Sequence, residues 1–291
     1  MSAGHATPVR LPTQRVGRFE PSQVVLYIVL SLIALLYIFP FLIQVATVFK
    51  TDNDAALHPL SLIPQNWTSA ALNQLVLHSD YGRWFLNSVI VTAFVTAGRV
   101  FFNSLAGYAL ARLHFRGRNA VFAALIGVMS VPMAVLLIPR FLILQNIGLY
   151  DTYAGMILPL LVDATGVFIM KNFFESIPVS VEESARVDGA STFRLFWSVV
   201  LPMAAPALIT ITILSFQGSW NELSHFVVST QSPRLATLTK GVAQLASGAV
   251  DAAKRYPFKL AAATIMTIPV IVLFFIFQKR IMNVGAGAVK E

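Results

Sequence analysis

A polar segment in the second half of the chain has the residue types and spacing needed to bind another protein. Ser180 and Glu183 are spaced as a capping box, which predicts the start of a short helix, and Gly189 predicts its end. Ser184 and Ala185 lie between them, and because both are small, a partner surface can approach this predicted helix closely. A helix that only lies on a membrane surface needs the same cap and stop, so these residues alone leave both interpretations open.

A second short helix is predicted directly after this glycine. Ser191 is placed to cap it at Thr192. Large apolar residues follow at the i, i+3, i+4, i+7 spacing of one helix face, namely Phe193, Phe196, Trp197 and Val200. This stripe is expected to lie against the ends of membrane-spanning helices, and the two short helices together form an elbow.

Motifs for catalysis are absent from the sequence. There is no G-x-x-x-x-G-K-[ST] loop to hold phosphates, and no H-E-x-x-H or G-x-S-x-G arrangement for hydrolysis. The five histidines are dispersed and there is no cysteine, so neither a metal cluster nor a thiol nucleophile is indicated. The chain is predicted not to be an enzyme and to hold no cofactor, so any ATP hydrolysis must come from another chain.

The composition is that of an integral membrane protein. Hydrophobic residues make up 56% of the 291 residues and charged residues only 12%. The mean hydropathy of +0.72 is far too high for an ordinary soluble domain. The formal net charge of +8 is scattered around the apolar stretches and is not gathered on one face. It therefore indicates membrane orientation and not nucleic-acid binding.

Six apolar stretches are each long enough to cross a lipid bilayer as a helix. They predict an all-α, polytopic membrane domain over residues 24–284, with spans at 24–49, 84–110, 119–143, 152–174, 201–223 and 257–280. The elbow falls in the loop 175–200, between spans four and five. Residues 1–23 precede the first span, and residues 285–291 form a C-terminal tail.

The orientation is predicted from a compact basic turn between spans two and three. Arg112, Arg116 and Arg118 lie close together there, and short loops rich in arginine stay in the cytoplasm. An even number of spans then places both termini and the elbow in the cytoplasm. The two long outer stretches, 50–83 and 224–256, contain several prolines and are expected to form ordered caps over the outer mouth.

Four further residues are candidates for a solute pathway. Arg99 falls inside span two, where a cation must face protein or water. It either lies beside the pathway, near Glu222 or a solute hydroxyl, or is held by backbone carbonyls or by reaching the interface. Trp220, Asn221 and Glu222 end span five and combine an aromatic face with hydrogen-bonding groups, a mixture suited to a sugar. An interfacial tryptophan with polar neighbours gives the same pattern.

The chain resembles a known family, the inner-membrane permease subunits of ATP-binding-cassette importers of the maltose and oligosaccharide type. The elbow is similar to the family's EAA loop in Glu183-Ser184-Ala185, Asp188-Gly189 and Leu201-Pro202. Ser184 stands where the family usually has an alanine. Similar motifs occur at 83–88, 106–113, 173–178, 220–222 and 285–290, so the resemblance covers nearly the whole chain from the first span onward.

This resemblance implies that the elbow helix sits in a cleft of a cytoplasmic ATPase subunit and transmits its closure to the pore. The predicted coupling residues are Glu182, Glu183, Ser184, Ala185, Asp188 and Gly189. It also implies a multi-pass protein of the cell inner (plasma) membrane, with a second homologous permease, two ATPase subunits that bind ATP and Mg, and an external solute-binding protein as partners. The implied function is import of a sugar or oligosaccharide by alternating access.

Two alternatives belong to other functional classes. A stand-alone secondary transporter or channel for a polar solute predicts acidic or polar residues inside the spans and internal symmetry. Apart from Arg99 and Asp163, the spans offer little of this. A membrane scaffold whose elbow recruits a regulatory protein is the other alternative, and a measurement of solute flux separates it from a transporter.

Overall fold

The computed structural model describes residues 21–247 and 256–287, and every regular element within them is helical. The α-helices are α1 (Pro21–Val48), α2 (Asp52–Leu57), α3 (Ala70–Leu77), α4 (Tyr81–Arg112), α5 (Arg118–Met129), α6 (Leu137–Asn146), α7 (Tyr153–Ile157), α8 (Ala164–Ser176), α9 (Val179–Val187), α10 (Thr192–Leu195), α11 (Leu201–Met203), α12 (Ala205–Trp220), α13 (Ser224–Ser229), α14 (Leu238–Ser247) and α15 (Tyr256–Gly287). Short 3-10 helices are η1 (Met133–Leu136), η2 (Leu158–Leu160) and η4 (Pro233–Leu235), and η3 (Phe196–Val200) is a π-helix. Most of the predicted terminal segments 1–23 and 285–291 lies outside the described residues.

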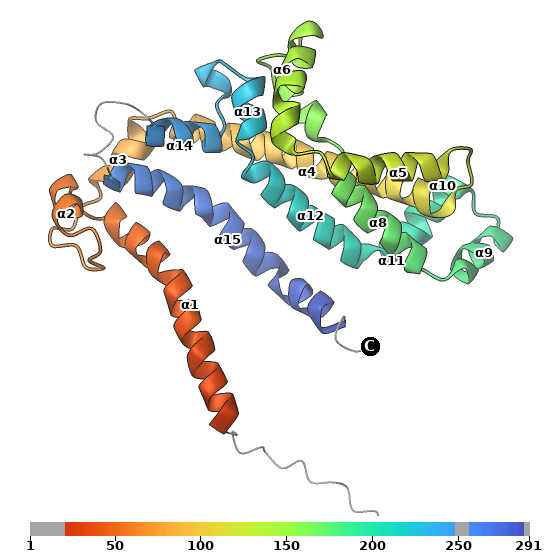
Figure 1. Cartoon of the computed structure of the whole chain (residues 1–291), viewed down its shortest axis with the longest axis horizontal. Coiled ribbons are helices and arrows are strands. Elements are labelled where there is room, and N and C mark those ends of the chain that lie inside the picture. The colour runs from red at the N-terminus through yellow and green to blue at the C-terminus, as the bar shows by residue number, and fades with distance from the viewer. Residues whose placement is uncertain (1–20, 248–255, 288–291) are drawn as a thin grey trace, which may run out of the picture.

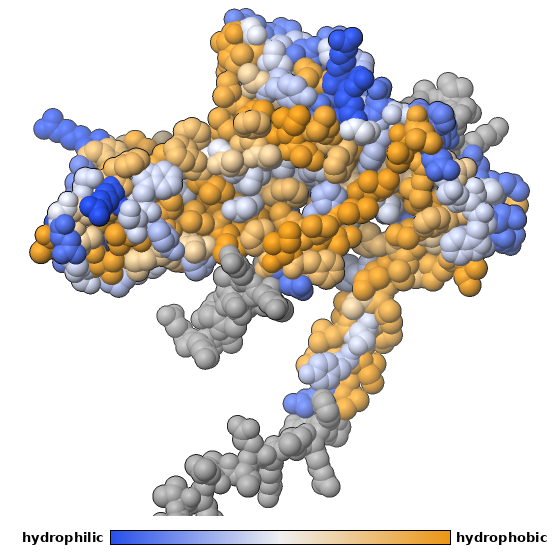
Figure 2. All heavy atoms as spheres, turned by 180° about the vertical axis from the view of Figure 1, so that it is seen from behind, coloured by the Kyte–Doolittle hydropathy of each residue, from blue (hydrophilic) through white to orange (hydrophobic). Residues whose placement is uncertain are grey.

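Four helical segments are long and apolar enough to cross a membrane, and they match predicted spans one, two, four and six. They are α1, α4, the segment Tyr153–Ser176 and α15. α4, α8, α12 and α15 run together as a bundle, whereas most of α1 leads away from it (Figure 1). Apolar residues cover the middle of this bundle, and hydrophilic residues gather towards its two ends (Figure 2). The architecture is therefore that of a helical, multi-pass membrane protein.

Predicted spans three and five are each divided into two helices by a sharp bend. α5 and the helices after it meet at 100°, and the helices before and after Ala204 meet at 80°. Pro132 lies in the first break, and proline disfavours a helical conformation of the residue before it. At the second break Pro206 has no N–H to donate to the carbonyl of Pro202, so the helix cannot continue regularly through Ala204.

The bundle is centred on α4, which packs closely against α8 and α12. A Cβ atom at Gly107 of α4 would lie 2.6 Å from Cβ of Met170 and 2.9 Å from the backbone nitrogen of Lys171. Met170 and Phe174 of α8 are fully buried in the core at this contact. Small residues at 107 and 111 thus allow a close contact between the two helices, since Ala111 is also buried.

The outer stretches are ordered where the structure describes them, as predicted. α2 and α3 form the first cap and α13, η4 and α14 form the second, while residues 248–255 lie outside the described ranges. Two buried lysines hold these caps together: Nζ of Lys50 donates to the carbonyl of His58 at 2.8 Å, and Nζ of Lys240 donates to Oγ1 of Thr230 at 2.9 Å. Each cap therefore has a buried polar anchor.

The α4–α8 contact generates a stability prediction for Gly107→Ala. The added methyl group has to push α8 away, and overpacking of this kind costs about 1–3 kcal/mol. The melting temperature of the purified protein in mild detergent should therefore fall by several degrees. It is measured by size-exclusion chromatography after heating. The matched control is Gly82→Ala on the same helix, where a Cβ atom meets nothing within 4 Å. Equal melting temperatures for the two variants would contradict the close contact.

Candidate functional site

The elbow begins at a proline and not at the predicted capping box. α9 starts at Val179, with Pro178 as the residue that caps it and Ile177 in an extended conformation. Ser180 lies inside the first turn, and no side chain caps the helix. The carbonyl of Ser180 instead accepts a hydrogen bond from the Ser184 hydroxyl at 2.8 Å. The capping-box prediction was therefore wrong by two residues, because proline fits the start of a helix without needing an N–H partner.

The predicted stop at Gly189 is confirmed. Gly189 has a φ of +80°, in the left-handed region that glycine adopts without strain. Its N–H donates to the carbonyl of Arg186 at 3.0 Å, and the N–H of Ala190 donates to the carbonyl of Ala185 at 3.0 Å. These two bonds form a Schellman motif, which satisfies the last carbonyl groups of α9 and turns the chain sharply.

The second helix of the elbow starts as predicted but continues differently. The Ser191 hydroxyl accepts a hydrogen bond from the N–H of Arg194 at 3.3 Å. After Leu195 the chain becomes the π-helix η3, which changes the angular spacing of the side chains. Phe196 and Val200 are buried, and Trp197 is 38% exposed with its ring against Phe101 of α4, but Phe193 is 71% exposed. The predicted apolar stripe is therefore wrong for Phe193.

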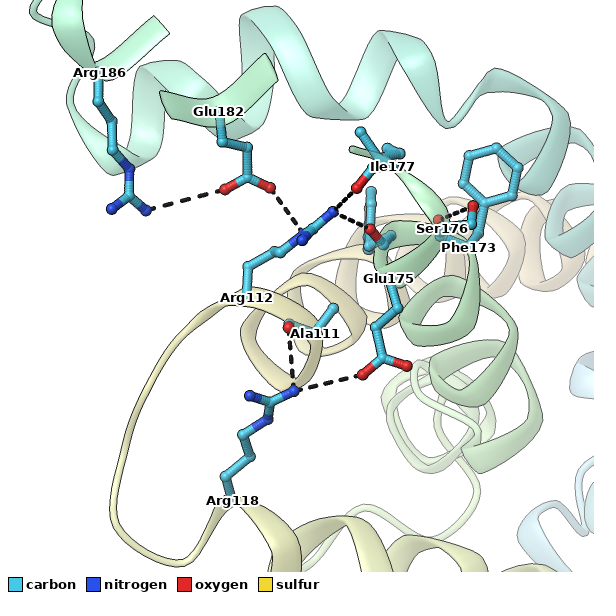
Figure 3. A network of polar contacts seen from close by, with 10 residues as sticks. Ala111, Arg112, Arg118, Phe173, Glu175, Ser176, Ile177, Glu182 and Arg186 are labelled. Carbon is cyan, nitrogen blue, oxygen red and sulfur yellow. Dashed lines mark hydrogen bonds and ion pairs between the residues drawn. The ribbon is translucent and has the colours of Figure 1, made fainter. Parts of the chain in front are cut away.

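A buried ion pair attaches the elbow to the bundle (Figure 3). Nε of Arg112, the last residue of α4, lies 2.9 Å from Oε1 of Glu182 on α9. The two side chains are only 11% and 5% exposed. The same guanidinium donates through Nη2 to the carbonyls of Phe174, at 2.7 Å, and Ile177. Arg112 thus joins the end of α4, the end of α8 and the start of α9.

The two adjacent glutamates of α9 point in different directions. Glu182 is buried against Arg112, whereas Glu183 is exposed. Ser184, Asp188 and Gly189 are exposed as well, and Ala185 is half-buried. Five of the six predicted coupling residues therefore lie wholly or partly on the surface, Ala185 packs partly against the core, and Glu182 is the one that is buried.

A second polar network secures the basic turn before α5 (Figure 3). Nη2 of Arg118 donates to the carbonyl of Ala111 at 3.1 Å and lies 3.5 Å from the Glu175 carboxylate. Nζ of Lys171 binds the other oxygen of Glu175 at 2.7 Å and lies over the Phe122 ring. α5 is therefore tied to α8 through polar and aromatic contacts at this end of the bundle.

Arg99 is held at a break in the helical segment Tyr153–Ser176. Its Nε donates to the carbonyl of Leu160 at 2.7 Å and lies 3.5 Å from Oδ2 of Asp163. Asn103, one turn further along α4, donates to Oδ2 of Asp163 at 3.0 Å and accepts from the Asp163 N–H at 3.2 Å. Of the two interpretations of Arg99, this geometry matches the one in which a backbone carbonyl holds it, with an added carboxylate.

The other three pathway candidates do not form one site with Arg99. Trp220 is 2% exposed, donates from Nε1 to the carbonyl of Met266 at 3.1 Å and stacks on Phe216, so its ring faces are occupied. Glu222 caps α13 by accepting a hydrogen bond from the N–H of His225 at 2.8 Å. Asn221 is exposed at the end of α12.

Sequence reasoning missed the partners that make these contacts. Arg112 was recognised only as part of a basic turn, and Asn103 was not singled out. The signal for Asn103 is its polarity inside an apolar span, four residues after Arg99. No corresponding signal pairs Arg112 with Glu182, because the two lie far apart in the sequence.

Comparisons with known proteins identify a family and several relatives of the chain. Residues 103–282 match the family described as the binding-protein-dependent transport system inner membrane component. The chain is 30% identical over 277 residues to the arabinooligosaccharides transport system permease protein AraQ of Bacillus subtilis, covering 94% of this chain and 98% of that protein. It is 32% identical over 264 residues to the diacetylchitobiose uptake system permease protein NgcG of Streptomyces coelicolor, covering 90% and 85%.

Among solved structures, the fold is similar to a chain from a bacterial ABC transporter involved in the import of the acidic polysaccharide alginate. The TM-score is 0.79 at 24% sequence identity, over 94% of this chain and 99% of that one. This similarity shows a shared fold. The match over residues 103–282 and the relatives at 30% identity or more show that the chain belongs to the binding-protein-dependent transport system inner membrane component family.

Proposed function

We propose that this chain is the permease subunit of an ATP-driven importer that carries a sugar or an oligosaccharide. Several relatives are named for sugar transport, among them AraQ, NgcG and the sulfoquinovosyl glycerol permease SmoH of Agrobacterium fabrum, which is 31% identical over 267 residues. Family membership favours this function over a stand-alone secondary transporter. The bent helix pairs around Pro132 and Ala204 each count as one span in this proposal, which gives six spans.

The coupling role is supported by the different positions of Glu182, which is buried, and Glu183, which is exposed. The buried Arg112–Glu182 pair fixes α9 to the bundle, and the exposed Glu183, Ser184, Asp188 and Gly189 leave a surface for a partner. An ATPase subunit bound to that surface can move α9 only by moving α4 and α8 with it. ATP binding and hydrolysis in the partner, with Mg, would thus bias the bundle between two conformations.

The proposed assembly has a second, homologous permease, two ATPase subunits and an external solute-binding protein. Both termini and α9 lie on the cytoplasmic side of the inner membrane, since the basic turn 112–118 is close to α9. The caps α2, α3, α13 and α14 lie at the opposite end and face the binding protein. Solute then enters between the caps and leaves beside the elbow.

The proposed pathway runs along the face of α8 and α12 that bears exposed polar residues. Thr165, Gln217 and Asn221 are exposed there, and Arg99 is half-buried beside them. Lipid does not stabilise such groups in the middle of a bilayer, so this face needs water or a second protein against it. Gln217 is an addition to the predicted pathway residues, while Trp220 and Glu222 support the pathway wall from behind through their contacts with Met266 and α13.

Charge reversal at Glu183 tests partner binding. Glu183→Arg should leave the chain folded, because the side chain is exposed, but should lower the amount of co-purified phosphate-loop ATPase about tenfold or more. The measurement is quantitative mass spectrometry of the complex purified in mild detergent. Asp52→Arg, an equally exposed charge reversal on α2 at the opposite end, is the control. An ATPase yield equal to the wild-type yield would refute the docking of α9.

The adjacent glutamates should respond differently to loss of charge. Glu182→Gln leaves Arg112 without its buried counter-ion, at a cost of about 1–3 kcal/mol, and should lower both the melting temperature and the solute carried per ATP hydrolysed. ATPase co-purification should be unaffected. Glu183→Gln should do the opposite: unchanged melting and weaker ATPase binding. Melting curves, pull-down yields and coupled transport assays in proteoliposomes measure these quantities, and identical behaviour of both variants would contradict the different roles of the two glutamates.

A further inference from the structure

A small cavity with an ion pair in its wall lies beside the helix break at Asp163. Its volume is about 210 Å³, and its lining residues are Arg99, Asp163, Thr165, Gly166, Ile211, Leu214 and Ser215. These residues come from α4, α8 with its cap, and α12. Arg99 is in the middle of α4, so the cavity lies about midway along the bundle, and it is lined by one ion pair and two hydroxyl groups.

Hydrogen-bond donors and acceptors are unevenly satisfied in this cavity. Both oxygens of Asp163 are occupied: Oδ1 accepts from the N–H of Gly166 at 2.7 Å, and Oδ2 accepts from Asn103 at 3.0 Å. Arg99 uses Nε for the carbonyl of Leu160. Within the described residues, its two Nη groups make no hydrogen bond, although the side chain is only 15% exposed. The cavity therefore offers four N–H donors from one guanidinium.

The space next to these donors is kept open by a glycine. A Cβ atom at Gly218 of α12 would lie 3.2 Å from Nη1 of Arg99, which is tighter than almost all real contacts of a Cβ atom. Gly218 is itself exposed on the face that bears Gln217 and Asn221. A side chain at position 218 would therefore crowd the Nη1 group of Arg99.

The charge and size of the cavity limit what binds there. The positive charge of Arg99 is balanced by Asp163 at 3.5 Å, so an anionic group would gain little and would approach the Asp163 carboxylate. Pockets for drug-sized ligands are usually about 300–1,000 Å³, so this cavity takes part of a small ring and not a whole oligosaccharide. Neutral oxygen acceptors on a compact ring satisfy both conditions.

We infer that this cavity is a subsite for one neutral sugar unit of the carried solute, with the Nη groups of Arg99 donating to adjacent ring hydroxyls and Ser215 and Thr165 completing the contacts. This inference rests on the proposed import function and specifies which residues of this subunit touch the cargo. Arg99 thereby has two roles: Nε supports the broken helix, and the Nη groups contact solute.

The experiment uses the whole purified transporter in lipid nanodiscs without the solute-binding protein. Uptake into proteoliposomes, with the binding protein present, first identifies which probe is carried among arabinobiose, diacetylchitobiose and an alginate disaccharide. Equilibrium binding of the carried, radiolabelled probe is then compared for the wild type, Ser215→Ala, Gly218→Ala and Arg99→Lys. The matched control is Ser219→Ala, one turn along α12, whose hydroxyl contacts Thr92 outside the cavity.

Ser215→Ala should weaken binding about 2- to 12-fold, as expected for one lost hydrogen bond. Gly218→Ala should weaken it similarly without lowering the melting temperature, since alanine favours a helix over glycine. Arg99→Lys should lose about tenfold or more, and Ser219→Ala should bind like the wild type. If Ser215→Ala and Gly218→Ala both bind the carried probe with wild-type affinity, the subsite is refuted and the proposed import function stands. Carriage of only the acidic probe would overturn the neutral-sugar assignment, and carriage of none would count against the proposed cargo class and the subsite together.

Discussion

A break in a membrane helix exposes backbone groups that lipid cannot satisfy, and at the break within the segment Tyr153–Ser176 α4 supplies partners for them. Arg99 binds the carbonyl of Leu160, Asn103 binds the N–H of Asp163, and Arg112 binds the carbonyl of Phe174 at the end of α8. Between these polar contacts, Gly107 allows α8 to lie directly against α4. The unbroken helix α4 thus supports the broken segment Tyr153–Ser176. The elbow, the basic turn and the polar face depend on the contact between these two.

Several features of the fold and of the elbow were predictable because they depend on local chemistry. Long apolar stretches identify spans, Gly189 identifies a helix stop because only glycine enters the left-handed region without strain, and Ser191 identifies a helix start. The capping box at Ser180 failed because Pro178, two residues earlier, competes for the same helix start. Phe193 was misplaced because a π-helix has a different angular period from the α-helix assumed for the stripe.

Contacts between distant residues were not predictable in the same way. Nothing in the sequence indicates that the last residue of α4 pairs with Glu182 and leaves Glu183 free, because that choice depends on how α9 is rotated about its axis. The sharp bends in predicted spans three and five were also missed, although Pro132, Pro202 and Pro206 were visible. Proline in a span is compatible with a kink of any size, so the angle comes from packing and not from the residue type.

Arg99 and Arg112 lie on one continuous helix, so a tilt of α4 moves both residues at once. The two residues are thirteen positions apart, which corresponds to about 20 Å along an α-helix. A tilt of α4 by about 5° around the Asn103 contact would shift Arg99 by about 0.5 Å and Arg112 by about 1.2 Å, because Asn103 lies four residues from the first and nine from the second. The shift at Arg99 is comparable to the clearance at Gly218, where one added methyl group would crowd the guanidinium. The position of the elbow and the free space beside the Arg99 guanidinium would therefore change together when α4 tilts.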